Sequence, residues 1–291
     1  MMFKLNVPTK RGIILNGVLF RNKEEKNNDT VMISITGIHG NFYSNPFYYN
    51  IGETLNSGDI DFIYAQTNDA FSRIETININ INTGKKEIIG SWNERFSYTD
   101  EDIEAYINFA KQEGYKHIIL AGHSLGANKV IYYLSRNYDK RIEHFFLLSP
   151  ANLTHMMSEV TEKEKFLIQR QLDSGNGNKM LPFLFMGWVE CIAYTAYDWQ
   201  FSGLLNNVHT EKNADFSQAE KIKHNGAMLV GTYDNFTDGD PSEFLRNLNE
   251  HMPTASENEL IFIEKTGHTY QQKHQEVAED ILLQLQKWKS A

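Results

Sequence analysis

The sequence is poor in cysteine and in long apolar runs, and each shortage excludes a class of protein. Cys191 is the one cysteine among 291 residues, so an internal disulfide and a cysteine-rich zinc site are both excluded. A chain of this length can bury a sizeable core without such links. The longest apolar stretch, residues 181–196, contains Pro182 and Glu190 and is shorter than the roughly 20 residues that cross a bilayer. The sequence therefore predicts a protein without a membrane span.

A secretory signal and an excess of positive charge are also lacking. The first residues do not show the basic start and apolar run of such a signal, which favours a soluble, cytoplasmic protein. With 28 Lys and Arg against 37 Asp and Glu, the net charge is −9, which argues against a nucleic-acid partner. The sequence contains no phosphate-binding loop, dinucleotide-binding glycine pattern or zinc-ligand spacing, so we expect no metal and no other cofactor. It does not indicate an oligomeric state.

What the sequence does contain is a regular alternation of apolar, strand-like runs with helix-like segments. The predicted strands cover residues 31–38, 60–66, 117–121, 142–149, 227–232 and 260–264. The predicted helices cover residues 45–55, 99–113, 125–137 and 271–288, with another after Pro241. Strands that alternate with helices build a mostly parallel sheet with helices on both faces. The expected fold class is therefore α/β.

Residues 152–220 interrupt this alternation. They contain a helix-like segment at 161–172, a polar turn sequence and then a block that is rich in aromatic residues. We interpret them as a mainly helical cap, inserted into a sheet domain that residues 1–151 and 221–291 form together.

The strongest chemical signal is Gly122-His123-Ser124-Leu125-Gly126, which follows a predicted strand and opens a predicted helix. A turn from strand to helix in so few residues strains the serine backbone, and side chains two positions away on either side would clash. Glycine at both positions avoids the clash, and the turn presents the Ser124 hydroxyl above the sheet beside a helix N-terminus. We therefore predict that Ser124 is a nucleophile.

A serine hydroxyl needs a base to activate it, and ten histidines are available. His268 follows the last predicted strand and precedes the last helix, which places it at the carboxyl edge of the sheet, where the Ser124 turn also lies. His274 falls within that helix. His123 adjoins Ser124, and its ring cannot easily reach back to the hydroxyl. His268 is therefore the expected base.

The base needs an acid to orient it, and three carboxylates follow the strand at 227–232. Asp234 comes first and lies nearest the strand end, so we favour it. Asp238 and Asp240 remain alternatives, although their Asp-Gly-Asp-Pro sequence is also typical of a turn and a helix cap.

An acyl-transfer site also needs donors for the oxyanion. The backbone N–H of Leu125, the residue after the nucleophile, is expected to be one. The second should come from the loop after the first buried strand, where the N–H of Asn41 is the first choice and that of Phe42 the next.

Together these residues resemble the α/β-hydrolase fold superfamily. The resemblance is carried by His39-Gly40-Asn41, Gly122-His123-Ser124-Leu125-Gly126, Gly231-Thr232-Tyr233-Asp234 and Gly267-His268. It implies a mostly parallel eight-stranded sheet flanked by helices, a Ser-His-Asp triad and no cofactor. Within the superfamily the layout is similar to serine esterases, including a poorly characterised group related to siderophore esterases. Type II thioesterases usually place their acid after an earlier strand, where this chain has Ser149-Pro150-Ala151-Asn152.

The expected activity is hydrolysis of a carboxylic ester of a small or medium-sized molecule. The triad serves equally well for a thioesterase, an amidase or an acyltransferase, and a catalytically silent binding protein on the same fold is a further alternative. Side chains that could line the substrate pocket are Phe42, His123, Trp188, Tyr197 and Trp199. The cap aromatic residues could instead pack the cap onto the sheet domain.

Overall fold

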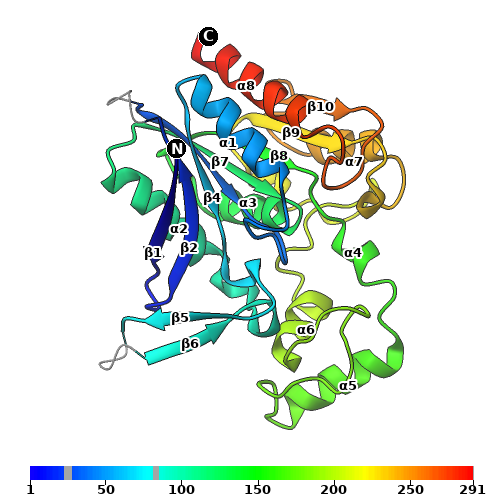
Figure 1. Cartoon of the computed structure of the whole chain (residues 1–291). Helices are drawn as coiled ribbons and strands as arrows, with labels where there is room; N and C mark the ends of the chain where they lie inside the picture. The colour runs from blue at the N-terminus through cyan, green and yellow to red at the C-terminus, as the bar shows by residue number, and fades with distance from the viewer. Residues whose placement is uncertain (23–27, 81–84, 291) are drawn as a thin grey trace.

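A central sheet organises the molecule (Figure 1). The computed structural model describes residues 1–22, 28–80 and 85–290, and within these ranges eight strands form this sheet in the order β1-β2-β4-β3-β7-β8-β9-β10. The strands are β1 (Met2–Pro8), β2 (Ile14–Phe20), β3 (Thr30–Ile35), β4 (Asp61–Ala65), β7 (His117–His123), β8 (Ile142–Leu148), β9 (Gly226–Gly231) and β10 (Glu259–Ile263). From β4 to β10 all neighbours pair in parallel, and β2 is antiparallel to both β1 and β4. The predicted α/β class with a mostly parallel sheet is confirmed.

Helices cover both faces of the sheet (Figure 1). Helices α1 (Phe47–Ser57) and α8 (His274–Ser290) lie on one face, and α2 (Thr99–Gln112), α3 (Leu125–Arg136) and α7 (Pro241–Glu250) lie on the other. Strand β3 shows why: it is buried along its whole length, with Val31 and Ile33 in the core under α2 and α3, and Met32 in the core under α1 and α8. An apolar run without alternation is typical of a strand covered on both sides.

The strand order places a crevice at the carboxyl ends of β3 and β7. The chain passes from β3 through α1 to β4 on one side of β3, and β7 then pairs on its other side. Connections that leave in opposite directions from adjacent parallel strands open a crevice at the sheet edge, which is where ligands bind in open α/β sheets. The strand predicted at 31–38 ends at Ile35, so the loop that borders this crevice begins three residues earlier than expected.

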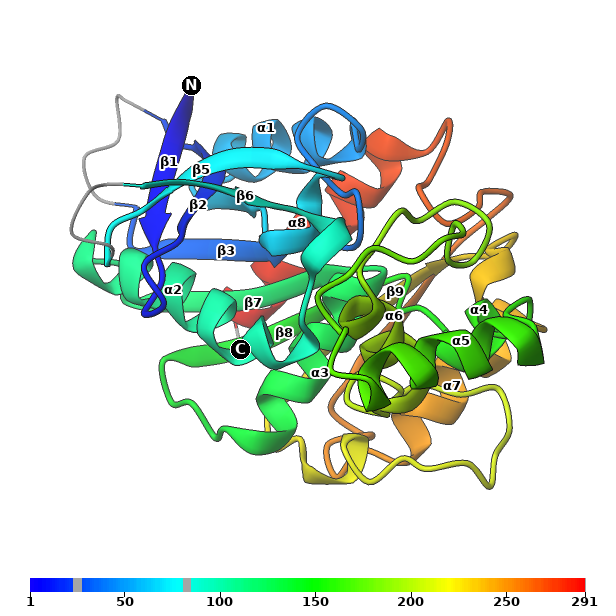
Figure 2. The ribbon, with the colours of Figure 1, turned by 90° about the horizontal axis from the view of Figure 1, so that it is seen from below.

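The segment predicted as a cap does not pack as one unit. It contains α4 (Leu153–Met156), α5 (Glu162–Asp173), α6 (Ala193–Phe201) and η4 (Ala219–Lys221). Its apolar side chains up to Leu205 form a separate cluster that includes Leu125 of α3, whereas Val208, Phe216 and Ala219 belong to the core of the sheet. The last residues of the segment therefore pack with the sheet core, and the earlier ones form their own cluster. Figure 2 shows α5 and α6 on the opposite side of the molecule from β1.

Shorter elements complete the fold. A separate two-stranded sheet pairs β5 (Ile74–Asn78) with β6 (Lys85–Ile89). Single turns of helix are η1 (Asn68–Ala70), η2 (Ser91–Asn93), η3 (Phe96–Tyr98) and η5 (Asn235–Thr237). Within the described ranges, no helix combines the length and apolar character that crossing a membrane requires.

Candidate active site

The turn between β7 and α3 holds Ser124 in a strained conformation. Its φ is 57° and its ψ is −130°, a backbone conformation that residues other than glycine rarely adopt. The flanking glycines make the turn possible, because a Cβ on Gly122 would lie 2.2 Å from the carbonyl oxygen of Gly126, and one on Gly126 would lie 2.2 Å from that of Ile35. The turn sets Ser124 at the N-terminus of α3, at the carboxyl edge of the sheet.

His268 and Asp234 meet at the same edge, on the loops after β10 and β9. Nδ1 of His268 lies 2.9 Å from one carboxylate oxygen of Asp234 and 3.1 Å from the other. The Asp234 side chain is fully buried, and that of His268 is 12% exposed. Burial alone would raise the pKa of Asp234, but the charge and hydrogen bond of His268 outweigh it, so the pKa is lowered. Asp234 is therefore an ionised acceptor for the Nδ1–H of the imidazole.

The other two carboxylates of this loop have different partners. Asp238 is exposed, and one of its carboxylate oxygens lies 3.3 Å from Nδ1 of His155. Asp240 caps α7, because its Oδ1 accepts hydrogen bonds from the backbone N–H groups of Ser242 and Glu243. Of the three candidates, Asp234 is the one that the structure brings to His268.

His123 links the serine turn to the loop of His268. Its Nε2 lies 2.8 Å from the carbonyl oxygen of His268, and the two rings are 5.0 Å apart. Burial, with the nearby charge of His268, lowers the pKa of His123 to about 3, so the ring is neutral and donates from Nε2. His123 is 2% exposed and packs against Phe47 and Tyr270. The sequence suggested His123 as a pocket residue, but its ring is buried among these side chains.

The two N–H groups expected to be the second oxyanion donor already have acceptors. The backbone N–H of Asn41 donates to the carbonyl oxygen of His39 at 3.1 Å and to the hydroxyl of Ser44 at 3.1 Å, within its own loop. The N–H of Phe42 donates to Oε1 of Gln66 at 2.8 Å. Both predicted second donors are therefore occupied.

Another backbone N–H group lies earlier in the same loop. Within the described ranges, the N–H of Ile38 has no hydrogen-bond acceptor. The preceding residue, Gly37, touches the serine turn: a Cβ on it would lie 3.0 Å from the Cβ of Ser124 and 3.2 Å from the amide nitrogen of Leu125. Leu125 is the first residue of α3, so the helix itself offers no acceptor for its N–H. The amide of Leu125 directly follows Ser124, and that of Ile38 directly follows the glycine that contacts the serine turn.

A buried network of one lysine and two acidic residues is hydrogen-bonded to this loop. Lys129, one turn into α3, lies 2.9 Å from a carboxylate oxygen of Asp69 and 2.9 Å from one of Glu94, and all three side chains are at most 2% exposed. The carbonyl oxygen of Asp69 in turn accepts the N–H of His39 at 2.9 Å. Nothing in the sequence around Lys129 indicated that a lysine on this helix is buried.

Glu94 should make the stability of the protein depend on pH. Burial raises the pKa of Glu94 to about 8 from an ordinary 4.5, against the lowering effect of the Lys129 charge. Between these values the folded state holds a proton that the unfolded state has released, so stability present below pH 4.5 is lost as the pH rises towards 8, by up to about 1 kcal/mol per pH unit. Glu94→Gln cannot titrate, so its free energy of unfolding should fall less over this range.

Urea unfolding at several pH values between about 5 and about 8 measures the difference. Glu75→Gln is the matched control, because Glu75 is an exposed glutamate whose side chain is 58% accessible, and it should follow the wild type. A decline in Glu94→Gln parallel to that of the wild type would contradict the prediction.

The predicted pocket residues are dispersed. Phe42 packs against Phe20, Tyr49 and Tyr64, beside β2. Trp199 is 4% exposed and belongs to the apolar cluster of residues 152–205. These two positions do not fit a pocket role, because their rings are used for packing.

Two of the predicted pocket residues are more exposed than Phe42 and Trp199. A third residue near His268 was not predicted from the sequence. Tyr197 is half-buried, with its ring 5.4 Å from that of Phe201. Trp188 is 46% exposed, and its ring lies 5.4 Å from that of His39 in the loop beside Ser124. The missed residue is Phe236 of η5, whose ring is 4.3 Å from that of His268.

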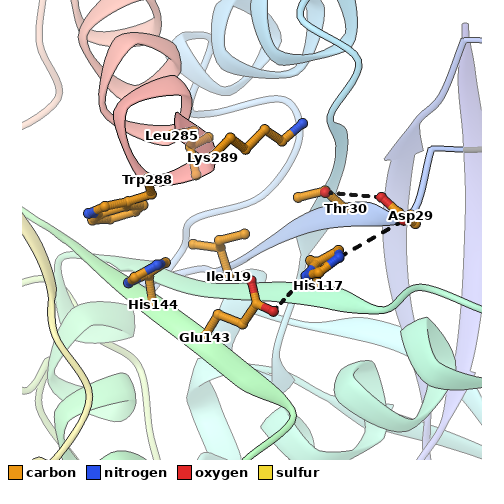
Figure 3. Close-up of a pocket in the computed structure, with 9 residues that line it drawn as sticks. All are labelled: Asp29, Thr30, His117, Ile119, Glu143, His144, Leu285, Trp288 and Lys289. Carbon is orange, nitrogen blue, oxygen red and sulfur yellow. Dashed lines mark hydrogen bonds and ion pairs between the residues drawn. The ribbon is translucent and has the colours of Figure 1, made fainter. Parts of the chain in front are cut away.

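A separate cavity of about 500 Å³ lies at the opposite, amino-terminal edge of the sheet (Figure 3). Trp288 of α8 stacks on His144 at 4.1 Å, and His117 forms an ion pair with Glu143 at 2.5 Å. The cavity lies at the starts of β7 and β8, whereas Ser124 follows the end of β7. It is therefore remote from the serine turn.

Several solved structures are similar to this one. Est1E from Butyrivibrio proteoclasticus has a TM-score of 0.67 at 16% sequence identity, and the match covers 99% of both chains. The alpha/beta hydrolase GrgF from Penicillium sp. sh18 has a TM-score of 0.67 at 14% identity, over 98% of this chain and 97% of its own. The Pyrococcus furiosus esterase Pf2001 has a TM-score of 0.59 at 18% identity, over 99% of this chain and 91% of its own. At these identities the likeness shows a shared fold. No protein-family model and no curated protein matches the sequence.

Proposed function

The chain has the α/β-hydrolase fold, and from this premise we propose that it is a serine hydrolase that cleaves a carboxylic ester of a small or medium-sized molecule. One observation carries the proposal. Nδ1 of His268 lies 2.9 Å from the buried carboxylate of Asp234, on loops at the sheet edge where the strained Ser124 also lies. A nucleophile, a base and an orienting acid on one edge are the parts that acyl transfer needs.

In the proposed mechanism Ser124 attacks the ester carbonyl carbon. Nε2 of His268 takes the hydroxyl proton, and Asp234 stabilises the imidazolium that forms. The negative charge that develops on the carbonyl oxygen is held by the N–H groups of Leu125 and Ile38. His268 then returns the proton to the departing alcohol. A water molecule, activated by His268, attacks the acyl-enzyme, releases the carboxylic acid and restores Ser124.

Similar structures support an ester over a thioester or an amide. One is described as an esterase from Pyrococcus furiosus, another as the carboxylesterase CesB from Bacillus subtilis, and Est1E has been solved with ferulic acid bound. The apolar cluster of the inserted segment includes Leu125, the residue next to the nucleophile, which supports a role for residues 152–205 as a cap over the site.

A fluorophosphonate probe tests the nucleophile. It reacts with activated serine hydroxyls, so the wild-type protein should gain one adduct, which peptide mapping should locate at Ser124. Ser124→Ala should remain unlabelled. Ser174→Ala is the matched control, because Ser174 is an exposed serine at the end of α5, and it should be labelled like the wild type. Equal labelling of Ser124→Ala would refute the assignment.

The bond type is tested with one acyl group presented as an ester, a thioester and an amide. The proposal predicts the highest kcat/KM for the ester, measured with the same acyl group and similar leaving groups. A higher kcat/KM for the thioester or the amide would replace ester hydrolysis with that activity. Tight binding without turnover would instead favour a silent binding protein.

A further inference from the structure

A small cavity has in its wall a side chain that contacts His268. Its volume is about 180 Å³, and its walls come from α4 and the turn after it, from the cap turn at 186–188 and from η5. Phe236 on one wall has its ring 4.3 Å from that of His268, and Trp188 on another has its ring 5.4 Å from that of His39, next to Ile38. The cavity is therefore bounded by rings that touch the base on one side and the oxyanion loop on the other.

The wall formed by η5 is fixed by the segment that carries the acid. η5 begins directly after Asp234, whose carboxylate accepts the N–H of Phe236 at 2.9 Å. Asn152, before α4, donates its N–H to the carbonyl oxygen of Phe236 at 3.2 Å and its side-chain amide to that of Thr237 at 3.1 Å. Residues 155–159 are thereby held against Phe236, at a constant position relative to His268.

The opposite wall is a tight turn of the cap. Phe185 and Val189 exchange backbone hydrogen bonds at 2.8 and 2.9 Å, and both side chains are at most 1% exposed. Between them, Met186 and Gly187 adopt φ values of 54° and 79°. The anchored ends of the turn hold Trp188 outwards, which explains how a tryptophan next to the buried Val189 can be 46% exposed.

The lining of the cavity combines apolar side chains with exposed polar ones. Met156, Met186, Trp188 and Phe236 supply the apolar walls. The rim carries the exposed carboxylate of Glu159, and His155, also on the rim, is already paired with Asp238. The rim is therefore net negative. A volume of about 180 Å³ is below the range of whole drug-sized ligands, so the cavity suits one part of a substrate.

We propose that this cavity is a specificity subsite that binds a single aromatic ring of the ester, with a neutral or cationic polar substituent facing Glu159. The inference rests on the proposed ester hydrolysis and adds the substrate class. Aromatic rings pack edge-to-face or offset against other rings, and Trp188 and Phe236 offer both kinds of surface. An anionic substituent would meet an unpaired carboxylate at the rim, which lowers its kcat/KM.

The first experiment compares methyl acetate with methyl phenylacetate and benzyl acetate, which carry the ring on the acyl or the alcohol side. At least one aromatic ester should exceed methyl acetate in kcat/KM by about tenfold or more. Trp188→Ala should reduce this ratio by about tenfold. Leu184→Ala is the matched control, because Leu184 is a 51% exposed residue beside the same turn that does not line the cavity, and it should keep the wild-type ratio.

The second experiment tests the rim with para-hydroxy and para-carboxy derivatives of the preferred aromatic ester. The wild type should have the higher kcat/KM for the hydroxy compound. Glu159→Gln should have a smaller difference in kcat/KM between the hydroxy and the carboxy compounds. The subsite proposal is overturned if Trp188→Ala keeps the wild-type ratio of kcat/KM for the aromatic ester to kcat/KM for methyl acetate. Equal losses of kcat/KM for the two esters leave this ratio unchanged and have the same meaning. If the wild type hydrolyses none of these esters and resists the fluorophosphonate, the proposed function itself fails, and the subsite with it.

Discussion

Replacing Asp234 with asparagine is expected to lower kcat for ester hydrolysis by about 10⁴-fold. The carboxylate receives the Nδ1–H of His268 at 2.9 Å, which leaves Nε2 without a proton and able to take one from Ser124. An asparagine can present its amide N–H₂ to Nδ1 and so favour the opposite tautomer, in which Nε2 carries the proton. The fold should survive, because the asparagine oxygen can still accept the N–H of Phe236.

Two further variants in the same loop serve as controls for this test. Asp240→Asn should keep wild-type activity, since asparagine caps a helix as well as aspartate does. Asp238→Asn should lose less than about tenfold, because it breaks an exposed pair with His155. Steady-state rates and thermal unfolding should be measured for all three. A loss of about 10⁴-fold in Asp238→Asn or Asp240→Asn, with Asp234→Asn active, would move the acid to that residue.

The second large effect concerns stability. Lys129→Met is expected to lower the free energy of unfolding by about 3–5 kcal/mol, because it leaves the buried carboxylate of Asp69 without its cation and the buried Glu94 side chain without its hydrogen-bond donor. Charges that are buried without a partner are costly, whereas the loss of a whole ionic group is often tolerated. The triple variant Lys129→Met, Asp69→Asn, Glu94→Gln should therefore recover much of the lost stability.

A surface ion pair provides the comparison for this experiment. Lys86 and Glu75 lie 2.8 Å apart with side chains that are 73% and 58% exposed, so Lys86→Met should change the unfolding free energy by less than about 1 kcal/mol. Urea unfolding gives both values. An effect of Lys129→Met no larger than that of Lys86→Met would show that the buried network does not stabilise the fold.

The sequence was sufficient for the fold class because strand and helix patterns are local. Buried strands such as β3 and β7 are nearly continuous apolar runs, and Gly122 and Gly126 mark the turn between β7 and α3. The position of Ser124 also followed from local spacing, because the steric demand of the turn acts over only two residues on either side.

The oxyanion loop could not be predicted because its hydrogen bonds are not visible in the sequence. Thr36, Gly37 and Ile38 continue the apolar pattern of β3, so the predicted strand ran past its true end at Ile35. This moved the expected donor to Asn41, whose N–H is used within the loop. The available signal was Gly37, two residues after the end of the strand.

The buried network and the cavity were missed for a different reason. Lys129 is buried only because Asp69 and Glu94, far apart in the sequence, converge on it, and a lysine on a helix is usually exposed. The sequence does not distinguish Phe236 from an ordinary loop residue, because its contact with His268 forms only when η5 folds. In both cases the deciding contacts join distant segments. Likewise, Asp234, Asp238 and Asp240 occupy one short loop, and only its folded path shows which carboxylate meets His268.

The apolar cluster that joins α3 to residues 152–205 limits how this protein can be recombined with others. Leu125 and Tyr132 lie on α3 but belong to this cluster, together with Phe185 and Trp199. A segment transplanted from another protein in place of residues 152–205 would leave Leu125, which follows Ser124 directly, facing unmatched side chains. Chimeras should therefore exchange positions 125 and 132 of α3 along with the segment, and a segment moved without them is expected to disturb Ser124 before it changes the choice of substrate.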